Sequence, residues 1–273
     1  LFINDYFNKE AYKKHLEEQK AKIITAISCF YDIDDIKKFV LDVKSVLDKN
    51  GVFIISQNYL GAMLLQNGFE NIVHEHLSYQ SLLSLENMLK PYDLEVFDAE
   101  LNDINGGSFL TYICHKGERV VQNSVLSLRQ SEEMLELDTN EPYMAFAKRI
   151  EGIKEKIHSY IKIANNDGKI VFTLAASTRG NTLLQYCELD NALIKATGER
   201  NPEKVGKFFA SCGIPIVSEE EMRKEKPDVI LVLPWFFFPE VKEREKEYLE
   251  NGGTFLVPLP IPKLVTKEGE IEL

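Results

Sequence analysis

The feature that most constrains the fold is one strand–helix–strand pattern near the start of the chain. Residues 22–30 form a short apolar run with the length of a buried strand, and residues 52–56 form a second. Between them, apolar residues recur at helical spacing over 36–47, after a capping Asp34 or Asp35 and before Asn50-Gly51. Such a βαβ unit presents the carboxyl ends of its strands, here residues 29–32 and 57–59, to a ligand crevice.

Two further strands follow at 94–101 and 108–115, and Asn105-Gly106-Gly107 between them favours an antiparallel pair. A parallel sheet finished by an antiparallel pair is the layout of class I methyltransferases, although a fold alone does not settle function. A second α/β pattern predicts strands at 169–176, 192–196 and 228–233, a short helix from Asn201-Pro202, and a closing strand at 254–259. We therefore expect an α/β fold with two Rossmann-like parts, 1–120 and 168–273, joined by a helical connector over 121–167.

Composition excludes several classes of function. The net charge of -11 and pI of about 5.1 disfavour binding to a nucleic acid polymer. No apolar run approaches the roughly 20 residues that span a bilayer, and four cysteines without paired spacing indicate a reducing compartment. We expect a cytoplasmic protein without a membrane partner. Because the chain begins Leu-Phe-Ile-Asn-Asp, we expect it to be a fragment.

The cluster His74-Glu75-His76 is the strongest candidate for chemistry. Imidazole titrates near neutrality and a neighbouring carboxylate can stabilise it, so the cluster suits proton removal from a substrate. On an extended backbone, His74 and His76 would share one side and Glu75 would face the other. A metal site would need further ligands, and the remaining histidines and cysteines lack metal-binding spacing, so we predict no metal. A structural role, in turn capping or core hydrogen bonding, is the remaining alternative.

Two later stretches are candidate ligand sites. Ser177-Thr178-Arg179-Gly180-Asn181 lies between a predicted strand and a helix, where free N–H groups attract anions. Its alternative is a plain strand–helix turn capped by Thr178 or Asn181. Arg200 follows the next predicted strand, and two arginines at adjacent strand ends favour a phosphorylated ligand. Trp235 follows another strand end, where it either stacks on a base or packs between domains; packing is the simpler interpretation.

These stretches together resemble the sugar C-methyltransferase family, which methylates keto-deoxysugar nucleotides with S-adenosylmethionine. The resembling features occur in the family's order over most of the chain: His74-Glu75-His76-Leu77-Ser78-Tyr79, Gly106-Gly107-Ser108, Ser177 to Leu184, Arg200-Asn201-Pro202, Leu233-Pro234-Trp235 and Val257-Pro258-Leu259-Pro260. The family has an amino-terminal zinc domain, a methyltransferase domain and a carboxy-terminal nucleotide-binding-like domain. The zinc domain and the glycine-rich donor loop have no counterpart in this sequence.

The resemblance implies roles for individual residues. His76 would remove a proton beside a ketone, Glu75 would orient or assist it, and His74 or Tyr79 would support the enolate oxygen. The methyl donor would contact Cys29, Phe30, Tyr31, Asp32 and Gln57. The nucleotide sugar would contact residues from several strand ends: Asn105, Gly106, Gly107, Ser108, Ser177, Thr178, Arg179, Gly180, Asn181, Arg200, Asn201 and Trp235.

Two substitutions leave the reaction open. Val73 stands where many members have tyrosine before the histidine cluster, and Asp32 where many have histidine. Carbon methylation through an enolate is the first expectation, and methylation of oxygen or nitrogen on a sugar-like acceptor is the second. A third is a nucleotide-sugar binding module without catalysis. An oxidoreductase is disfavoured, since no G-x-G-x-x-G follows any predicted strand.

Overall fold

The computed structural model describes residues 1–273, which divide into two compact units. Unit 1 comprises residues 1–63 and 74–142, and unit 2 comprises residues 64–73 and 143–273. The chain therefore leaves unit 1 after Met63 and returns to it at His74. None of the helices combines the length and hydrophobicity that crossing a membrane requires.

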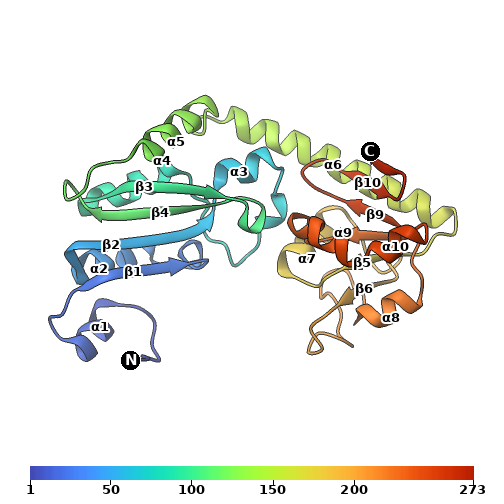
Figure 1. Ribbon diagram of the computed structural model, residues 1–273, viewed down its shortest axis with the longest axis horizontal. Helices are drawn as coiled ribbons and strands as arrows, with labels where there is room; N and C mark the ends of the chain where they lie inside the picture. The colour runs from blue at the N-terminus through green and yellow to red at the C-terminus, as the bar shows by residue number, and fades with distance from the viewer. The chain divides into compact units, whose positions relative to one another are not determined.

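Unit 1 contains a four-stranded sheet in the order β1-β2-β4-β3 (Figure 1). The strands are β1 (Ala21–Ile27), β2 (Leu47–Asn58), β3 (Leu94–Asn102) and β4 (Ser108–His115). β1 and β2 are parallel, and β4 runs antiparallel between β2 and β3. Insertion of the last strand, antiparallel, between its two predecessors gives the predicted class I methyltransferase layout. The fold prediction is thus confirmed for this unit.

The helices of unit 1 follow from their apolar spacing. They are α1 (Lys9–Leu16), α2 (Ile36–Val46), α3 (Leu60–Leu65), α4 (Leu82–Leu89) and α5 (Asn123–Met134). Asp35 caps α2 by accepting the Lys38 N–H at 2.9 Å, and Val40 and Val43 of α2 are fully buried. Leu85 and Leu89 of α4 join them in one core with Phe53 of β2. This core holds the carboxyl ends of β1 and β2 in place.

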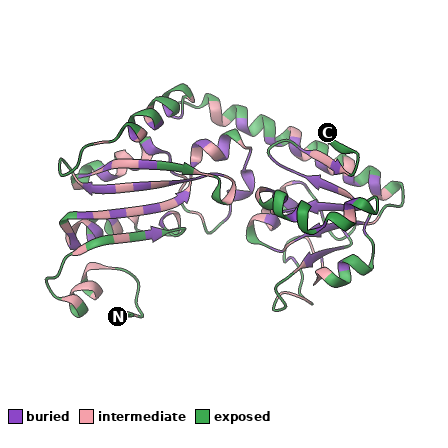
Figure 2. Cartoon of the chain, viewed as in Figure 1, coloured by how far each residue is buried: buried purple, intermediate pink, exposed green.

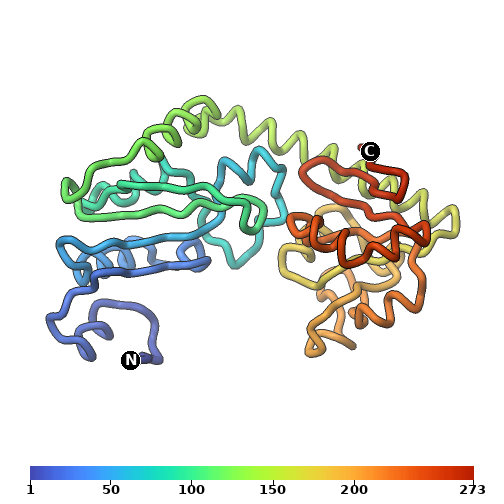
Figure 3. Tube along the Cα trace, viewed as in Figure 1, coloured from blue at the N-terminus to red at the C-terminus, as the bar shows by residue number.

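Unit 2 contains a seven-stranded sheet in the order β11-β10-β9-β8-β5-β6-β7. Its strands are β5 (Val171–Leu174), β6 (Ala196–Glu199), β7 (Ile216–Ser218), β8 (Val229–Val232), β9 (Thr254–Val257), β10 (Lys263–Thr266) and β11 (Gly269–Glu272). The strands from β9 to β7 are parallel, and β10 and β11 form an antiparallel hairpin beside β9, traced in red in Figure 3. The chain runs from β5 outward to β7 and then crosses to β8, so the order reverses between β5 and β8. This arrangement confirms the predicted Rossmann-like second part.

Buried strands and amphipathic helices form the core of unit 2. All residues of β5 and β8 are buried, and Figure 2 shows exposed surface concentrated on the helices. The helices are α6 (Glu141–Asn166), α7 (Thr178–Tyr186), α8 (Glu219–Lys224), α9 (Phe238–Arg244) and α10 (Lys246–Glu250). The stripe at helical spacing on α6 is buried as its periodicity indicates: Phe146, Ile150, Ile153, Ile157 and Ile161.

Three local predictions in unit 2 are wrong. The strand predicted at 192–196 begins only at Ala196, because Asp190 folds the preceding residues into a turn by accepting the Ala192 N–H at 2.9 Å. The helix predicted from Asn201 is a turn, in which the Asn201 side chain accepts the Glu203 N–H. The strand at 254–259 does not close the sheet, because β10 and β11 extend it.

Candidate active site

The carbonyl of Tyr31 anchors the histidine cluster in unit 1. Tyr31 lies in a 3-10 turn, Phe30–Asp32, directly after β1. Its carbonyl oxygen accepts the backbone N–H groups of Leu77 at 2.9 Å and Ser78 at 3.3 Å. The ring of Tyr31 also lies against the imidazole of His76, with 4.4 Å between the ring centroids. The structure therefore brings the end of β1 and the histidine cluster together.

A small pocket opens at this point in unit 1. It is lined by residues from the ends of β1 and β2 and from the histidine cluster: Tyr31, Asn58, Tyr59, Leu60, Met63, His76, Ser78 and Tyr79. The ring of Tyr79 also lies near His76, with 6.4 Å between the ring centroids. Sequence analysis named Tyr31, His76 and Tyr79 as site residues, placed Asn58 and Tyr59 at a strand end that faces a ligand, and included Ser78 in the histidine motif. It missed Leu60 and Met63, which lie on α3.

The three members of the cluster differ in exposure. His74 and Glu75 are exposed and lie in a turn, whereas His76 is half-buried in the pocket. The extended backbone considered above is therefore wrong for His74 and Glu75, and the two histidines do not share one face of a strand. Of the two imidazoles, His76 is the one placed to meet a molecule in the pocket.

Asp32 brings a second carboxylate toward His76. Partial desolvation raises the pKa of Asp32 above its ordinary value, and repulsion from Glu75 adds to this, while the charge of His76 acts to lower it. These effects place Asp32, Glu75 and His76 within electrostatic reach of one another. The structure therefore places two acidic side chains near His76: Asp32 from the turn after β1, and Glu75 next to it in the sequence.

Gln57 is an unsatisfied polar group at the carboxyl end of β2. Its side chain is buried, with 2% exposed, yet neither its amide nitrogen nor its oxygen has a hydrogen-bond partner. Ser78 likewise has a buried hydroxyl without a partner. Unpaired buried polar atoms are costly and rare, and a ligand that pairs with them removes the cost. Gln57 is thus prepared to bind a polar ligand.

The turn between β3 and β4 meets β2 near the same place. The carbonyl of Gly107 accepts the Tyr59 N–H at 3.1 Å, and Asn105, Gly106 and Gly107 all have positive φ. Ser108 is buried and its hydroxyl donates to the carbonyl of Ile104 at 2.8 Å. The predicted substrate residues of this turn therefore adjoin the pocket, and the Ser108 hydroxyl closes the turn.

Buried Glu132 fixes the start of the helix that follows the cluster. Its carboxylate oxygens accept the N–H groups of Leu82 at 2.6 Å and Leu83 at 2.9 Å, in the first turn of α4. The N-cap Ser81 accepts the Ser84 N–H at 3.1 Å. Burial raises the pKa of Tyr59, and the negative charge of Glu132 adds to that effect. Glu132 thus stabilises the start of α4, which follows the histidine cluster, and lies close to Tyr59, which lines the pocket.

In unit 2 the predicted anion-binding stretch, residues 177–181, forms the capped start of α7. Ser177 is the N-cap of α7 and accepts the Gly180 N–H at 3.0 Å, and Asn181 accepts a hydrogen bond from Ser211. A Cβ atom on Gly180 would lie 2.9 Å from Leu233, so the glycine allows α7 to approach the end of β8. Thr178 is exposed. Arg179 pairs with the buried carboxylate of Glu70, which sequence reasoning missed.

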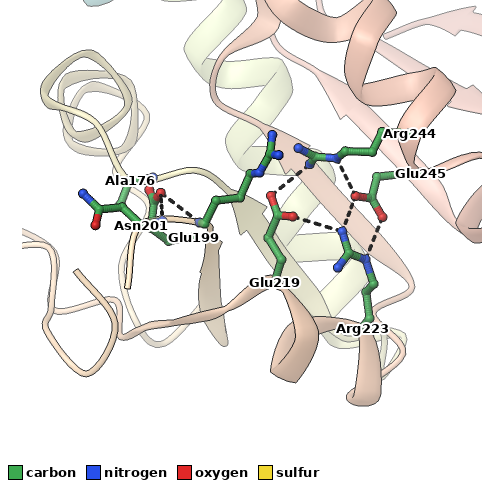
Figure 4. A network of polar contacts seen from close by, with 8 residues as sticks. Ala176, Glu199, Asn201, Glu219, Arg223, Arg244 and Glu245 are labelled. Carbon is green, nitrogen blue, oxygen red and sulfur yellow. Dashed lines mark hydrogen bonds and ion pairs between the residues drawn. The ribbon is translucent and has the colours of Figure 1, made fainter. Parts of the chain in front are cut away.

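The carboxyl end of β6 carries another carboxylate that sequence reasoning missed. Glu199 accepts backbone N–H groups from Ala176 at 2.6 Å and from Arg200 and Asn201 at 2.9 Å (Figure 4). Burial alone would raise the pKa of Glu199, but these donors and nearby Lys204 outweigh it and lower the pKa. Glu199 therefore occupies N–H groups that an external anion could bind. The side chains of Arg200 and Asn201 remain exposed.

Trp235 lies after β8 and is buried, with 7% exposed. Its indole Nε1–H donates to Glu70 at 2.8 Å. Of the predicted donor-site residues, Cys29 is exposed, while Phe30 is fully buried beside Phe53 with 6.2 Å between the ring centroids. The structure contains no group of three or more histidine, cysteine or acidic side chains arranged to hold a metal ion.

The strand order of unit 1, with a histidine pocket at its strand ends, defines a class I methyltransferase sheet followed by a Rossmann-like α/β unit. Residues 103–260, more than half of the chain, match the family described as C-methyltransferase C-terminal domain. The chain belongs to this C-methyltransferase family. It is 32% identical over 252 residues to C-methyltransferase NovU of Streptomyces niveus, covering 92% of this chain and 60% of that relative. The chain thus spans about 60% of the length of its curated relative.

Solved structures overlap only part of the chain. An O-methyltransferase family protein from Burkholderia thailandensis matches with a TM-score of 0.31 and 11% identity, over 42% of this chain and 36% of that protein. LepI in complex with SAM matches with a TM-score of 0.31 and 12% identity, over 36% of this chain and 27% of LepI. The fold assignment therefore comes from the strand order and pairing described above.

Proposed function

We propose that this chain is the acceptor-activating part of an S-adenosylmethionine-dependent C-methyltransferase. The observation that supports it is the position of His76, half-buried near the rings of Tyr31 and Tyr79 with Asp32 and Glu75 in electrostatic reach. A base in such a site can take a proton from carbon beside a ketone, and the two carboxylates stabilise the imidazolium that results. Tyr79, whose ring centroid lies 6.4 Å from that of His76, would support an enolate oxygen.

The residues at the ends of β1 and β2 fit a polar cofactor. The unpaired amide of Gln57 needs both an acceptor and a donor, and the ring of Tyr31 offers an aromatic wall. Together with Cys29 and Asp32, these residues would hold S-adenosylmethionine, which supplies an electrophilic methyl group when it is bound. Phe30 would support this site from the core rather than contact the cofactor, since its side chain is fully buried.

The proposed acceptor is a nucleoside-diphosphate-linked keto-deoxysugar. Arg200 and Asn201 are exposed at the carboxyl end of β6, where a cation and an amide suit a diphosphate and its sugar. Within unit 1, the turn at Asn105, Gly106 and Gly107 is a separate candidate contact for a sugar. Arg179 is left out of these diphosphate contacts, because its charge is already matched by Glu70.

Deuterium exchange in the full-length protein tests the proposed base. The assay incubates a nucleoside-diphosphate-linked keto-deoxyhexose in D2O with wild type or with H76N. His15 is exposed on α1 and outside the pocket, so H15N is the matched control. We expect exchange at the carbon beside the ketone to fall by about 10²- to 10⁴-fold in H76N only. Undiminished exchange in H76N would remove His76 as the base, and fragmentation of the methylated product identifies carbon, oxygen or nitrogen as the acceptor atom.

Calorimetric titration with S-adenosylhomocysteine tests the cofactor assignment. We expect Q57A to weaken binding by about 1–3 kcal/mol, because the amide of Gln57 loses its pairing with the ligand. The titration uses this chain and the full-length protein side by side. Failure of both wild-type forms to bind would favour a nucleotide-sugar binding module without catalysis.

A further inference from the structure

Glu70 is a buried carboxylate in the segment of residues 64–73. Its side chain is 1% exposed and pairs with the guanidinium of Arg179, while the indole N–H of Trp235 donates to the same carboxylate oxygen at 2.8 Å. The ring of Phe236 lies against the Arg179 guanidinium, with 4.5 Å between the guanidinium carbon and the ring centroid. Burying an unpaired carboxylate costs several kcal/mol, so this position of Glu70 depends on its partners in unit 2.

The partners of Glu70 belong to the two strand ends where ligands usually bind. Arg179 follows β5 and Trp235 follows β8, and the strand order reverses between these strands. In Rossmann-like sheets, the crevice at the carboxyl ends of two such strands is the ordinary ligand site. The carboxylate of Glu70 therefore pairs with groups that this fold normally offers to an external anion.

The rest of the segment is held on unit 2 as well. Arg149 of α6 donates to the side chain of Asn67 at 2.8 Å and to the carbonyl of Leu64 at 2.7 Å. The amide of Asn67 donates to the carbonyl of Pro260 at 2.9 Å. The ring of Phe69 lies against that of Tyr186, with 4.8 Å between the centroids. These contacts come from three separate parts of unit 2: α6, α7 and the turn after β9.

We propose that the segment of residues 64–73 is a built-in ligand of unit 2, and that Glu70 is a positioning residue for the histidine cluster. The Glu70 carboxylate fixes the segment on the strand ends of unit 2. Only Asn71, Ile72 and Val73 separate Glu70 from His74, where the chain returns to unit 1. A displacement of Glu70 would therefore be transmitted to His74 through only three residues of chain. The effect on catalysis rests on the proposed function, whereas the docking of Glu70 does not.

The sole tryptophan of this chain reports the docking directly. Trp235 donates its indole N–H to Glu70 in a buried site, so its fluorescence depends on that carboxylate. The E70Q variant keeps the shape of the side chain and removes the charge that pairs with Arg179. We expect a red-shifted emission and stronger acrylamide quenching in E70Q. E225Q is the matched control, because Glu225 forms an exposed pair with Lys195 in the same unit.

Kinetics of the full-length protein separate positioning from a general loss of structure. In E70Q we expect kcat for methyl transfer to fall by about 10- to 100-fold, because small displacements of catalytic groups have effects of this size. KM for the keto-deoxyhexose nucleotide should stay within twofold, E70D should recover part of kcat, and E225Q should match wild type. If E70Q does not fold, W235F tests the same contact by kinetics, since it removes the indole donor together with part of the ring system, and it should lower kcat by a smaller factor.

The fluorescence and the kinetics test separate parts of the proposal. Unchanged emission and quenching in E70Q would overturn the docking of Glu70 whatever the activity of the protein. Altered fluorescence with an unchanged kcat would overturn the positioning role and leave the docking. If the wild-type protein itself transfers no methyl group, the proposed function fails, while the fluorescence result still decides the docking.

Discussion

Glu245 allows a quantitative prediction about the stability of unit 2. Its carboxylate is 4% exposed and accepts from Arg223 at 2.5 and 3.0 Å and from Arg244 at 2.9 Å (Figure 4). Breaking a fully buried ion pair costs about 3–5 kcal/mol, and an exposed pair contributes at most about 1 kcal/mol. The arginine side chains are 47% and 31% exposed, which places this network between the two cases. We expect E245Q to lower the free energy of unfolding of unit 2 by about 2 kcal/mol at pH 7.

Urea unfolding followed by the fluorescence of Trp235 measures this loss, since Trp235 belongs to the same unit. With an m-value of about 2 kcal/mol per molar urea, the midpoint should fall by roughly 1 M. Glu243 is exposed on α9, two residues before Glu245, so E243Q is the matched control and should leave the midpoint unchanged within error. A midpoint for E245Q equal to that of E243Q would refute the reasoning.

The pH dependence provides an independent check. Burial alone would raise the pKa of Glu245, but Arg223 and Arg244 outweigh burial and hold the pKa below its ordinary value of 4.5. A carboxylate with a lowered pKa in the folded state stabilises that state fully above the unfolded pKa, and the stabilisation is lost as pH falls through the folded pKa. The difference between wild type and E245Q should therefore be constant above about pH 5 and shrink below pH 4.5. A difference that stays constant down to pH 3 would contradict this account.

Three further substitutions and one control test the stability of the two units. I157A removes a fully buried side chain of α6 and should cost about 2–5 kcal/mol in urea unfolding of unit 2. G61A places a Cβ atom 2.6 Å from the ring of Tyr59 and should cost about 1–3 kcal/mol, whereas G152A on the open face of α6 should be neutral or stabilising. E132Q weakens the charged cap of α4 and should lower the melting temperature of unit 1 by several degrees in calorimetry, with a loss of about 1–2 kcal/mol.

Sequence periodicity predicted those helices and strands whose structure follows from the pattern of their own residues. The stripe on α6 and the antiparallel pair β3–β4 follow from apolar spacing and from the glycines of the turn, and both are present. β6 was misplaced for a tertiary reason. Its residues Ala196-Thr197-Gly198-Glu199 have weak strand propensity, and Gly198 is required because a Cβ atom there would lie 2.5 Å from the sulfur of Met222 on α8. Leu193 and Ile194, which suggested the strand, lie in the preceding turn instead.

The candidate site was predicted where chemistry and chain order coincide. Tyr31, His76 and Tyr79 come from two motifs and line one pocket, because the carbonyl of Tyr31 accepts the N–H groups that follow His76. The roles of Glu199 and Glu132 were not predictable. Each carboxylate is satisfied by backbone N–H groups distant in sequence, and such pairing has no local pattern.

Glu70 shows most clearly why a single sequence is insufficient here. Its partners Arg179 and Trp235 are 109 and 165 residues away along the chain, so nothing near Glu70 indicates that its charge is buried. Once the pairing is known, two anchoring contacts flank the histidine cluster along the chain: Glu70 precedes it and pairs within unit 2, and the carbonyl of Tyr31 accepts, within unit 1, the N–H groups that follow it. Proton removal by His76 requires hydrogen-bond reach of the acceptor, so loosening either anchor should lower kcat without changing the base itself.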